Sequence, residues 1–271
     1  MSIAREFLYR SLLARTKEQN YLHKLERIRN IIPSIEDQYS NIDLNDAYME
    51  LKVRLQHVFQ TEIALKAFDY IKDKETKPMI VDIGDSSGNH YKYFKELLSE
   101  HNFDWLSINL DEKAIEKISN KNIPAKLCRA EELINEGIKA DLAFSFETLE
   151  HLFNPIQFLR DIALSKSVEY FCITVPYLTE SRVGLQHLKA KNYDDKVYAE
   201  NIHIFELSKQ DWKLLFEFSG WEVLEDFIYL QYPKSGLFRI TQPFWKKWDF
   251  EGFYGVILKR NLNKSNLYQS W

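Results

Sequence analysis

The sequence predicts an α/β protein with a doubly wound, mostly parallel sheet and a helical extension at its N-terminus. From Met79 onward, short apolar runs alternate with amphipathic segments of helical period. The apolar runs are nearly continuous, as expected for parallel strands that helices cover on both faces. Before residue 77, by contrast, the apolar residues follow only helical spacing.

Two helices are predicted in the extension, residues 1–76. The first covers residues 3 to about 31, and the second covers about 45–72. Asp43 or Asn45 is expected to cap the start of the second helix. The extension is expected either to cover a cofactor as a lid or to mediate formation of a homodimer.

Seven strands are predicted in the main domain, residues 77–260. They cover residues 79–83, 105–110, 125–128, 141–146, 168–176, 221–230 and 253–260. The helices predicted between them cover residues 90–100, 111–118, about 155–165 and 208–220. Insertions at 177–205 and 231–250 interrupt the alternation, and a polar tail covers 261–271. Long segments without regular structure in a compact domain are usually functional.

Composition excludes several classes of partner and location. The 271 residues include 45% hydrophobic ones, enough for one sizeable core and an appendage. The net charge of -4 comes from interleaved charges, so no nucleic-acid partner is expected. No apolar stretch approaches the ~18 residues that span a bilayer. Cys128 and Cys172 match no metal-ligand spacing or disulfide framework, which favours a cytoplasmic location.

The segment MIVDIGDSSGNHYKYF, which begins at Met79, is a strand, a turn of small residues and a helix. At the carboxyl end of a parallel strand, such a turn lets a ligand approach the backbone and the helix N-terminus. Gly84 and Gly88 permit the tight approach and positive φ angles. Taken alone, the segment is equally compatible with an ordinary strand-to-helix turn.

Polar residues also follow the second and fourth predicted strands. Asn109 ends the second strand, where a polar side chain can reach the ribose of a nucleoside-like cofactor. Glu147, Glu150 and His151 follow the fourth strand in the segment DLAFSFETLEHLFNPIQFL. The carboxyl ends of these strands share one edge of the sheet, so the sequence predicts a single site there.

These segments, in this order, resemble successive motifs of class I S-adenosylmethionine-dependent methyltransferases. The motifs are VDIGDSSG, SINLDEKAIEKI, CRAEEL, DLAFSFETLEHLFNPIQFL, ITVP and HIFELSKQDWKLLFEFSGWEV. The resemblance covers roughly Pro78 to Arg260 and implies a Rossmann-like fold that binds S-adenosylmethionine. A weaker resemblance, to methyltransferases that tailor bacterial capsule and surface polysaccharides, rests on the general look of the chain.

The resemblance also implies roles at the methionine end of the cofactor. Gly84, Asp85, Ser86 and Gly88 would line the methionine part, and Phe146 would lie near the methylsulfonium.

At the nucleoside end, the resemblance places Asn109 and Leu110 beside the ribose and adenine. Ala130 and Glu131 would contact the adenine edge.

Three residues depart from the family pattern. Ser86 takes the place of the middle glycine of the loop, and Asn109 replaces the usual acidic residue. Arg129 stands where an aspartate often contacts the adenine amino group. A neutral amide binds a ribose hydroxyl less strongly than a carboxylate does, so these residues weaken the expectation of tight binding.

Methyl transfer to a hydroxyl requires alignment of the acceptor and removal of its proton. His151 is the preferred base because it follows the fourth strand and a histidine titrates near neutrality. Glu147 could pair with His151 or contact the substrate. Tyr177, His187 and His203 are candidates for binding a small-molecule acceptor. For each of them the alternative is a purely structural role, such as packing, capping or a solvated loop.

The sequence therefore predicts methyl transfer to a small acceptor, at oxygen, on a sugar, a phosphoramidate or a nucleotide-linked precursor of capsule synthesis. One alternative is a noncatalytic methyltransferase-like binding protein, which the three departures favour. Another is a dinucleotide-dependent oxidoreductase of related topology, although the loop lacks a full GxGxxG. No metal is expected from the sequence.

Overall fold

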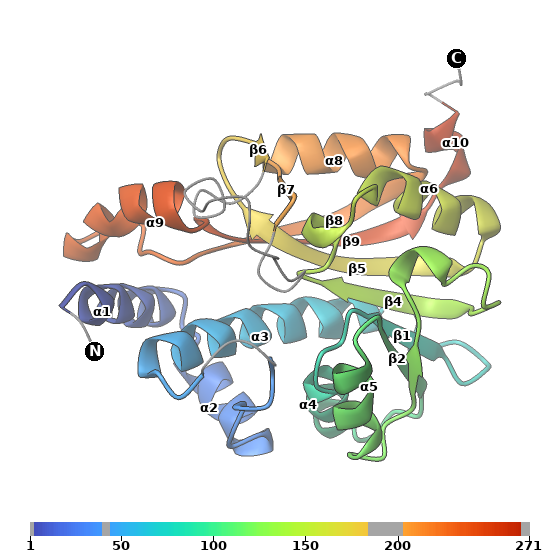
Figure 1. The fold of residues 1–271 in the computed structure, drawn as a ribbon, viewed down its shortest axis with the longest axis horizontal. Coiled ribbons are helices and arrows are strands. Elements are labelled where there is room, and N and C mark those ends of the chain that lie inside the picture. Colours follow the sequence, from blue (N-terminus) through green and yellow to red (C-terminus); the bar gives the residue numbers. More distant parts are fainter. Residues whose placement is uncertain (1–2, 40–43, 184–202, 267–271) are drawn as a thin grey trace.

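A seven-stranded sheet forms the centre of the protein (Figure 1). The computed structural model describes residues 3–39, 44–183 and 203–266. The strand order is β3-β2-β1-β4-β5-β9-β8. The strands are β1 (Met79–Ile83), β2 (Asp104–Asn109), β3 (Ala125–Leu127), β4 (Ala140–Phe146), β5 (Val168–Tyr177), β8 (Trp221–Leu230) and β9 (Gly252–Arg260).

Pairing along the sheet is parallel from β3 to β5 and antiparallel at β9. β1 pairs in parallel with both β2 and β4, and β4 pairs in parallel with β5. β9 runs antiparallel to β5 and to β8, between which it is inserted. The predicted mostly parallel, seven-stranded α/β sheet is therefore confirmed.

Helices cover both faces of the sheet, as Figure 1 shows. On one face lie α1 (Ile3–Glu18), α2 (Leu22–Ile31), α3 (Ala47–Phe68), α4 (Asn89–Leu97) and α5 (Glu112–Ser119). On the other lie α6 (Pro155–Ser165), α8 (Lys209–Phe218) and α10 (Leu262–Ser265). Each face has its own apolar core, and alternate residues of β1, such as Ile80 and Val81, enter opposite cores. This burial on both faces explains the continuous apolar runs of the strands.

The N-terminal helices share the core of the first face. α3 packs on β4, β5 and β9, and its residues Phe59 and Ile63 are buried there. Gly255 of β9 allows this contact, because a Cβ at that position would lie 2.1 Å from Ile63 Cδ1. The division between residues 1–76 and 77–260 stays a prediction.

Two details of the N-terminal helices correct the sequence analysis. The single helix expected over residues 3–31 is two helices, because Asn20 adopts a left-handed φ of 57° and ends α1. The amide of Tyr21 then donates to Thr16 O at 2.9 Å, the geometry of a left-handed helix C-cap. Asp46, and not Asn45, caps α3, since its carboxylate accepts from the amides of Tyr48 and Met49. Asp43 lies outside the described residues.

Both predicted insertions contain short regular elements. β6 (Arg182–Val183) and β7 (Phe205–Glu206) form a two-stranded sheet in the first insertion. The second contains η4 (Leu237–Thr241) and α9 (Gln242–Trp248). His187, predicted to bind the acceptor, lies outside the described residues.

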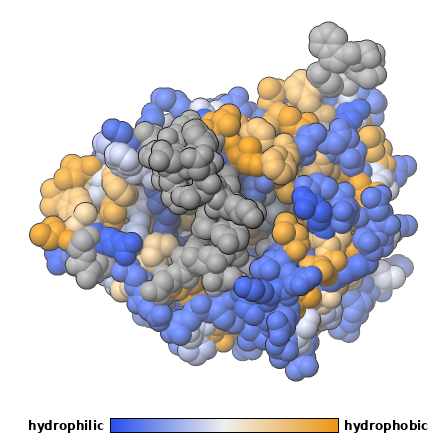
Figure 2. Space-filling model, viewed as in Figure 1, coloured by the Kyte–Doolittle hydropathy of each residue, from blue (hydrophilic) through white to orange (hydrophobic). Residues whose placement is uncertain are grey.

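The face in Figure 2 is mostly hydrophilic, with apolar residues gathered at the end formed by α1 and α9. Leu237, Ile240 and Trp248 are exposed there. None of the helices in residues 3–39, 44–183 and 203–266 combines the length and the apolar character that a membrane crossing requires.

Candidate functional site

The turn after β1 is held tightly against the residue that follows β4. Gly84 has a φ of +89°, and a Cβ there would lie 2.3 Å from Thr148 Oγ1. Gly88 has a φ of +75° and begins α4, where a Cβ would lie 2.5 Å from Ile123 Cδ1. Both glycines thus adopt the positive φ angles that the sequence analysis expected of them.

Asp85 fixes the shape of this turn from within. Its Oδ1 accepts hydrogen bonds from the amides of Ser87 (3.1 Å) and Gly88 (2.8 Å). Its Oδ2 accepts from the hydroxyl of Ser107 on β2 at 2.6 Å. The carboxylate is 2% exposed, so it acts as an internal brace for the loop.

Beneath the turn, Asp82 of β1 pairs with His90 of α4 at 2.9 Å. Burial raises the pKa of Asp82 to about 6, although the imidazole opposes this. Burial alone would lower the pKa of His90, but the charge of Asp82, the hydrogen bond to Asp82 and the charge of Asp85 together outweigh it, so the pKa is raised. Asp82, Asp85 and His90 are called the loop cluster below.

Gln38, in the segment between α2 and α3, reaches across to the turn. Its Oε1 accepts from Ser87 Oγ (2.8 Å) and Asn89 Nδ2 (2.6 Å), and its Nε2 donates to Ser86 Oγ at 3.0 Å. The side chain is 3% exposed. The N-terminal extension thereby closes over the loop through one glutamine, which no local pattern in the sequence singles out.

Asn109, at the end of β2, also braces the turn. Its Nδ2 donates to Asp85 O at 2.9 Å, and its Oδ1 accepts from the amide of Asp111 at 2.9 Å. The next residue, Leu110, is 53% exposed. An exposed apolar side chain at this strand end offers a flat contact for a ring system.

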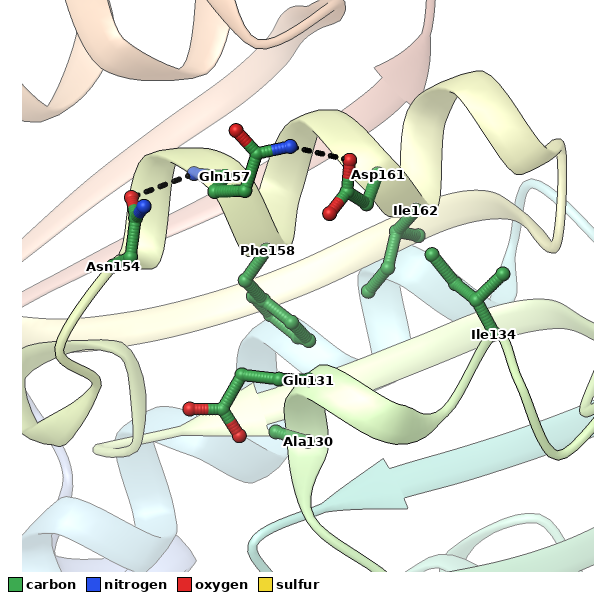
Figure 3. Close-up of a pocket in the computed structure, with 8 residues that line it drawn as sticks. All are labelled: Ala130, Glu131, Ile134, Asn154, Gln157, Phe158, Asp161 and Ile162. Atoms are coloured by element: carbon green, nitrogen blue, oxygen red, sulfur yellow. Dashed lines mark hydrogen bonds between the residues drawn. The ribbon is translucent and has the colours of Figure 1, made fainter.

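Ala130 and Glu131 begin η1 (Ala130–Glu132), opposite α6. A cavity of about 80 Å³ lies between η1 and α6. Figure 3 shows Ile134 and Phe158 among its lining residues. Ligand pockets for whole cofactors are about 300–1,000 Å³, so this hollow alone is too small for one. Arg129 lies beside Glu131, with Nε and Oε2 3.8 Å apart.

A second group of titratable residues lies beyond the end of β4. It consists of Glu147, of Glu150 and His151 in η2 (Leu149–His151), and of His203 just before β7; these four are called the edge cluster. A hydrogen bond of 2.7 Å from the amide of Ile204 to Glu150 O joins β7 to η2. That bond brings His203, far away in sequence, next to the two residues predicted at this edge.

Glu150 is buried and Glu147 is half-buried, and few contacts compensate either carboxyl group for its loss of water. Burial raises the pKa of Glu147 to about 8, against the opposing effects of the Thr174 hydroxyl and the Lys52 charge. Burial, and then the charge of Glu147, raise the pKa of Glu150 well above its usual range. Within the described residues, no hydrogen bond of ordinary geometry reaches Glu147 Oε1 or either oxygen of Glu150. Such groups cost free energy, so they call for a functional reason.

Both histidines of the edge cluster face Glu150. His151 Nε2 lies 3.8 Å and His203 Nε2 4.0 Å from Glu150 Oε1, beyond hydrogen-bonding distance. The two rings meet edge to face, with centroids 4.9 Å apart. His203 Nδ1 pairs with Glu206 Oε1 at 2.8 Å, and Glu206 is paired in turn with Arg182.

Comparison with solved structures identifies the fold, although no family model and no curated protein matches the sequence. One similar structure is a Leishmania major S-adenosylmethionine-dependent methyltransferase (15% identity, 88% of this chain, 82% of that chain, TM-score 0.53). A second is Burkholderia thailandensis 1,6-didemethyltoxoflavin-N1-methyltransferase, bound to its substrate and S-adenosylhomocysteine (13%, 93%, 89%, 0.53). A third is the [4+2]-cyclase SpnF (11%, 92%, 97%, 0.52).

The fold is that of the S-adenosylmethionine-dependent methyltransferases. The strand order separates this methyltransferase fold from that of the dinucleotide-dependent oxidoreductases, in which the order is 3-2-1-4-5-6 without an inserted antiparallel strand.

In the methyltransferase fold, the remaining predicted residues lie between the two clusters or beside them. Phe146 is buried, and its ring meets that of His90 edge to face at 5.0 Å. Tyr177 ends β5 half-buried, and burial raises its pKa. The structure thus gathers the loop residues, Phe146 and the edge cluster at one sheet edge.

Proposed function

We propose that this protein transfers a methyl group from S-adenosylmethionine to a hydroxyl group of a small acceptor. The observation that carries the proposal is the edge cluster, a partly buried group of carboxyls and imidazoles beside the glycine turn, with Glu150 fully buried. Its unpaired polar atoms suit an acceptor whose proton must be removed. The fold and the S-adenosylhomocysteine bound to a similar structure support the choice of cofactor.

The residues at the turn fit this cofactor. Gly84 and Ser86 would hold its methionine part, with Asp85 and Asn109 keeping the turn in shape. The exposed side chain of Leu110 would contact the adenine. When bound, S-adenosylmethionine supplies an electrophilic methyl group on a sulfonium.

At the nucleoside end, we propose that Asn109 also lies beside the ribose. Ala130 and Glu131 would contact the adenine edge, whereas Gly88 would line the methionine part, at the start of α4.

Removal of the acceptor proton falls to the edge cluster, with His151 as the proposed base and Glu147 beside it. Phe146 would keep water away from the reacting atoms. Tyr177, at the end of β5, and His203, a member of the edge cluster, would contact the acceptor. His187 is retained as a proposed contact from the first insertion.

For the acceptor, we propose a sugar, a phosphoramidate or a nucleotide-linked precursor of bacterial capsule or surface polysaccharide. One support is the weaker resemblance noted in the sequence. The other is the set of aromatic and basic residues in η4 and α9, which suit a sugar or nucleotide ligand; Lys247 Nζ, for example, lies 5.1 Å from the centroid of the Trp248 ring. A cytoplasmic location and a homodimer remain part of this proposal.

Calorimetric titration with S-adenosylmethionine tests the cofactor assignment, and two glycine variants make it specific. Gly84→Ala is expected to lower cofactor affinity more than about tenfold, since the new Cβ displaces Thr148 and strains a positive φ. Gly137→Ala is the matched control: it carries a φ of +65° but meets nothing within 4 Å. Absence of binding to the wild type at millimolar cofactor, or equal affinity in both variants, would refute the assignment.

A second candidate function is noncatalytic binding of a partner on the same fold. The closing of the turn by Gln38, and the use of both polar atoms of Asn109 within the chain, favour it. SpnF has a similar fold but is named a [4+2]-cyclase, so a protein of this fold can be named for an activity other than methyl transfer. Cofactor binding without methyl transfer to any hydroxylated sugar or nucleotide-sugar probe would select this candidate.

A further inference from the structure

The arrangement of Glu150, His151 and His203 is not explained by proton transfer alone. A single base needs one imidazole with access to the acceptor. Here two imidazoles from separate segments direct Nε2 atoms toward the same carboxylate oxygen, at 3.8 and 4.0 Å. These distances are too long for hydrogen bonds, and the carboxylate is fully buried.

We propose that Glu150, His151 and His203 bind a divalent transition-metal ion of the zinc class. Their ligand atoms all lie within 4.8 Å of one another. Metal–ligand bonds of about 2.0–2.1 Å place the ligand atoms of a tetrahedral site about 3.3 Å apart. The distances from Glu150 Oε1 to the two imidazole nitrogens, 3.8 and 4.0 Å, exceed this value by less than about 1 Å, so one ion can contact all three side chains after small movements of the side chains.

The unpaired oxygens of Glu150 are the independent observation that points to a ligand. Both are buried and lack a hydrogen-bond donor among the described residues. An ion would pair one or both of them without any change of the backbone. It would also remove the cost of burying an unpaired carboxylate.

His203 is already oriented as a metal-binding histidine. Its Nδ1 pairs with Glu206 at 2.8 Å, which leaves Nε2 directed at Glu150. Glu206 is fixed in turn by Arg182, whose Nη1 donates to Lys246 O at 2.9 Å. A carboxylate behind a histidine sets its tautomer and orientation in metal sites.

The donor set selects the kind of ion. Two imidazole nitrogens and one carboxylate favour zinc-class ions, whereas magnesium prefers oxygen ligands and retains several waters. Three protein ligands leave at least one coordination position open. That position can hold the acceptor hydroxyl, whose pKa the ion would lower. With the ion bound, His151 would act as a ligand, and the charge of the ion would favour the ionised form of Glu147, the fourth residue of the edge cluster, which could then accept the acceptor's proton.

The loop cluster also places two carboxylates and a histidine together, but its atoms are already paired. Asp85 accepts three hydrogen bonds, and His90 is bonded to Asp82 and lies 3.3 Å from Gln60 Oε1. A metal there would have to break these bonds. The proposal therefore assigns the ion to the edge cluster.

The proposal is tested by measuring metal binding to the protein after a chelator has removed any bound metal. This measurement does not depend on methyl transfer. Co²⁺ is titrated into the protein while the visible absorption of the bound ion is recorded. Zn²⁺ is titrated in a separate calorimetric experiment. We expect one equivalent of each ion and no comparable affinity for Mg²⁺. Loss of a residue that hydrogen-bonds to a metal ligand typically lowers metal affinity ~10–100-fold. Loss of a ligand itself should have a larger effect, so His203→Gln and Glu150→Gln are expected to lower Zn²⁺ affinity by more than about 100-fold.

Matched variants make the outcome decisive. His23→Gln changes an exposed histidine of α2 and should bind Zn²⁺ like the wild type. Zn²⁺ should raise the Tm of the wild type and of His23→Gln, but not that of His203→Gln. Equal Zn²⁺ affinity in His203→Gln and wild type, or loss of the ion in His90→Gln instead, would overturn the proposal. Cofactor binding is measured separately, so failure of this proposal leaves the assignment of methyl transfer to its own test.

Discussion

The loop cluster and the edge cluster lie at the same edge of the sheet, but their polar atoms are used differently. In the loop cluster, Asp85 accepts three hydrogen bonds and Asp82 is paired with His90 at 2.9 Å. In the edge cluster, Glu150 is equally buried but has no hydrogen bond of ordinary geometry from a described residue. The same residue types therefore have opposite effects on the folded state.

This difference assigns the clusters distinct roles. A buried carboxylate with all its partners in place stabilises a loop conformation. A buried carboxylate without partners destabilises the fold, and it persists where function requires it. Phe146, whose ring contacts His90 and whose backbone leads directly into Glu147, lies between the two.

The largest effect is expected from removing the brace of the turn. Asp85→Ala leaves the amides of Ser87 and Gly88 and the hydroxyl of Ser107 without their acceptor, and should lower the free energy of unfolding by about 3–5 kcal/mol. Urea denaturation measures this value. The comparison variant Glu150→Gln should change it by less than about 1 kcal/mol in chelator-treated protein, because no hydrogen bond is lost. Equal losses in the two variants would remove the distinction between the clusters.

Much of the fold could be predicted because its signals are local. The strand of residues 79–83 is five apolar or buried residues followed by a turn, and the structure has it at the same residues. Ser208 is of a residue type that commonly caps helices, and its hydroxyl accepts from the Asp211 amide at the start of α8. The break of the first helix at Asn20 was missed, since an asparagine within an amphipathic run gives only a weak stop signal.

The site could be predicted only where its residues follow strands. Glu147, Glu150 and His151 follow β4, so topology alone places them at the sheet edge. The contact of His203 with these three residues depends on the hydrogen bond that joins β7 to η2. The contact of Gln38 with the turn after β1 depends on how the N-terminal helices pack. Neither contact leaves a periodic pattern in the sequence. The roles given to the individual site residues stay predictions.

An intermediate effect is expected in the pH dependence of stability, through Glu147. Its pKa is about 8 in the folded protein and near 4.5 when unfolded, so the folded state holds a proton that the unfolded state has released between these values. Stability of the chelator-treated protein should therefore fall as the pH rises from about 5 to 8, with a contribution from Glu147 on the order of 3 kcal/mol.

Glu147→Gln, which is neutral at every pH, should lose this contribution. Thermal and urea unfolding of both proteins at a series of pH values measure it. The slope of stability against pH should be smaller in the variant throughout this range. A slope that is unchanged, or one of opposite sign in the wild type, would show that Glu147 is not held in its protonated form by burial.

The smallest effect concerns Gln38, which extends the loop cluster into the N-terminal helices. Gln38→Ala removes one acceptor from Ser87 and Asn89 and one donor from Ser86, and is expected to cost about 1–2 kcal/mol in unfolding free energy. Gln19→Ala is the matched control, because the Oε1 of Gln19 is buried without a described hydrogen-bond partner. If Gln38 only braces the turn, the variant should also bind S-adenosylmethionine more weakly. If the Gln38 side chain instead occupies space that the cofactor needs, the affinity of the variant for S-adenosylmethionine should rise while its free energy of unfolding falls. In that case the contact between Gln38 and the turn would have to open before the wild type binds the cofactor.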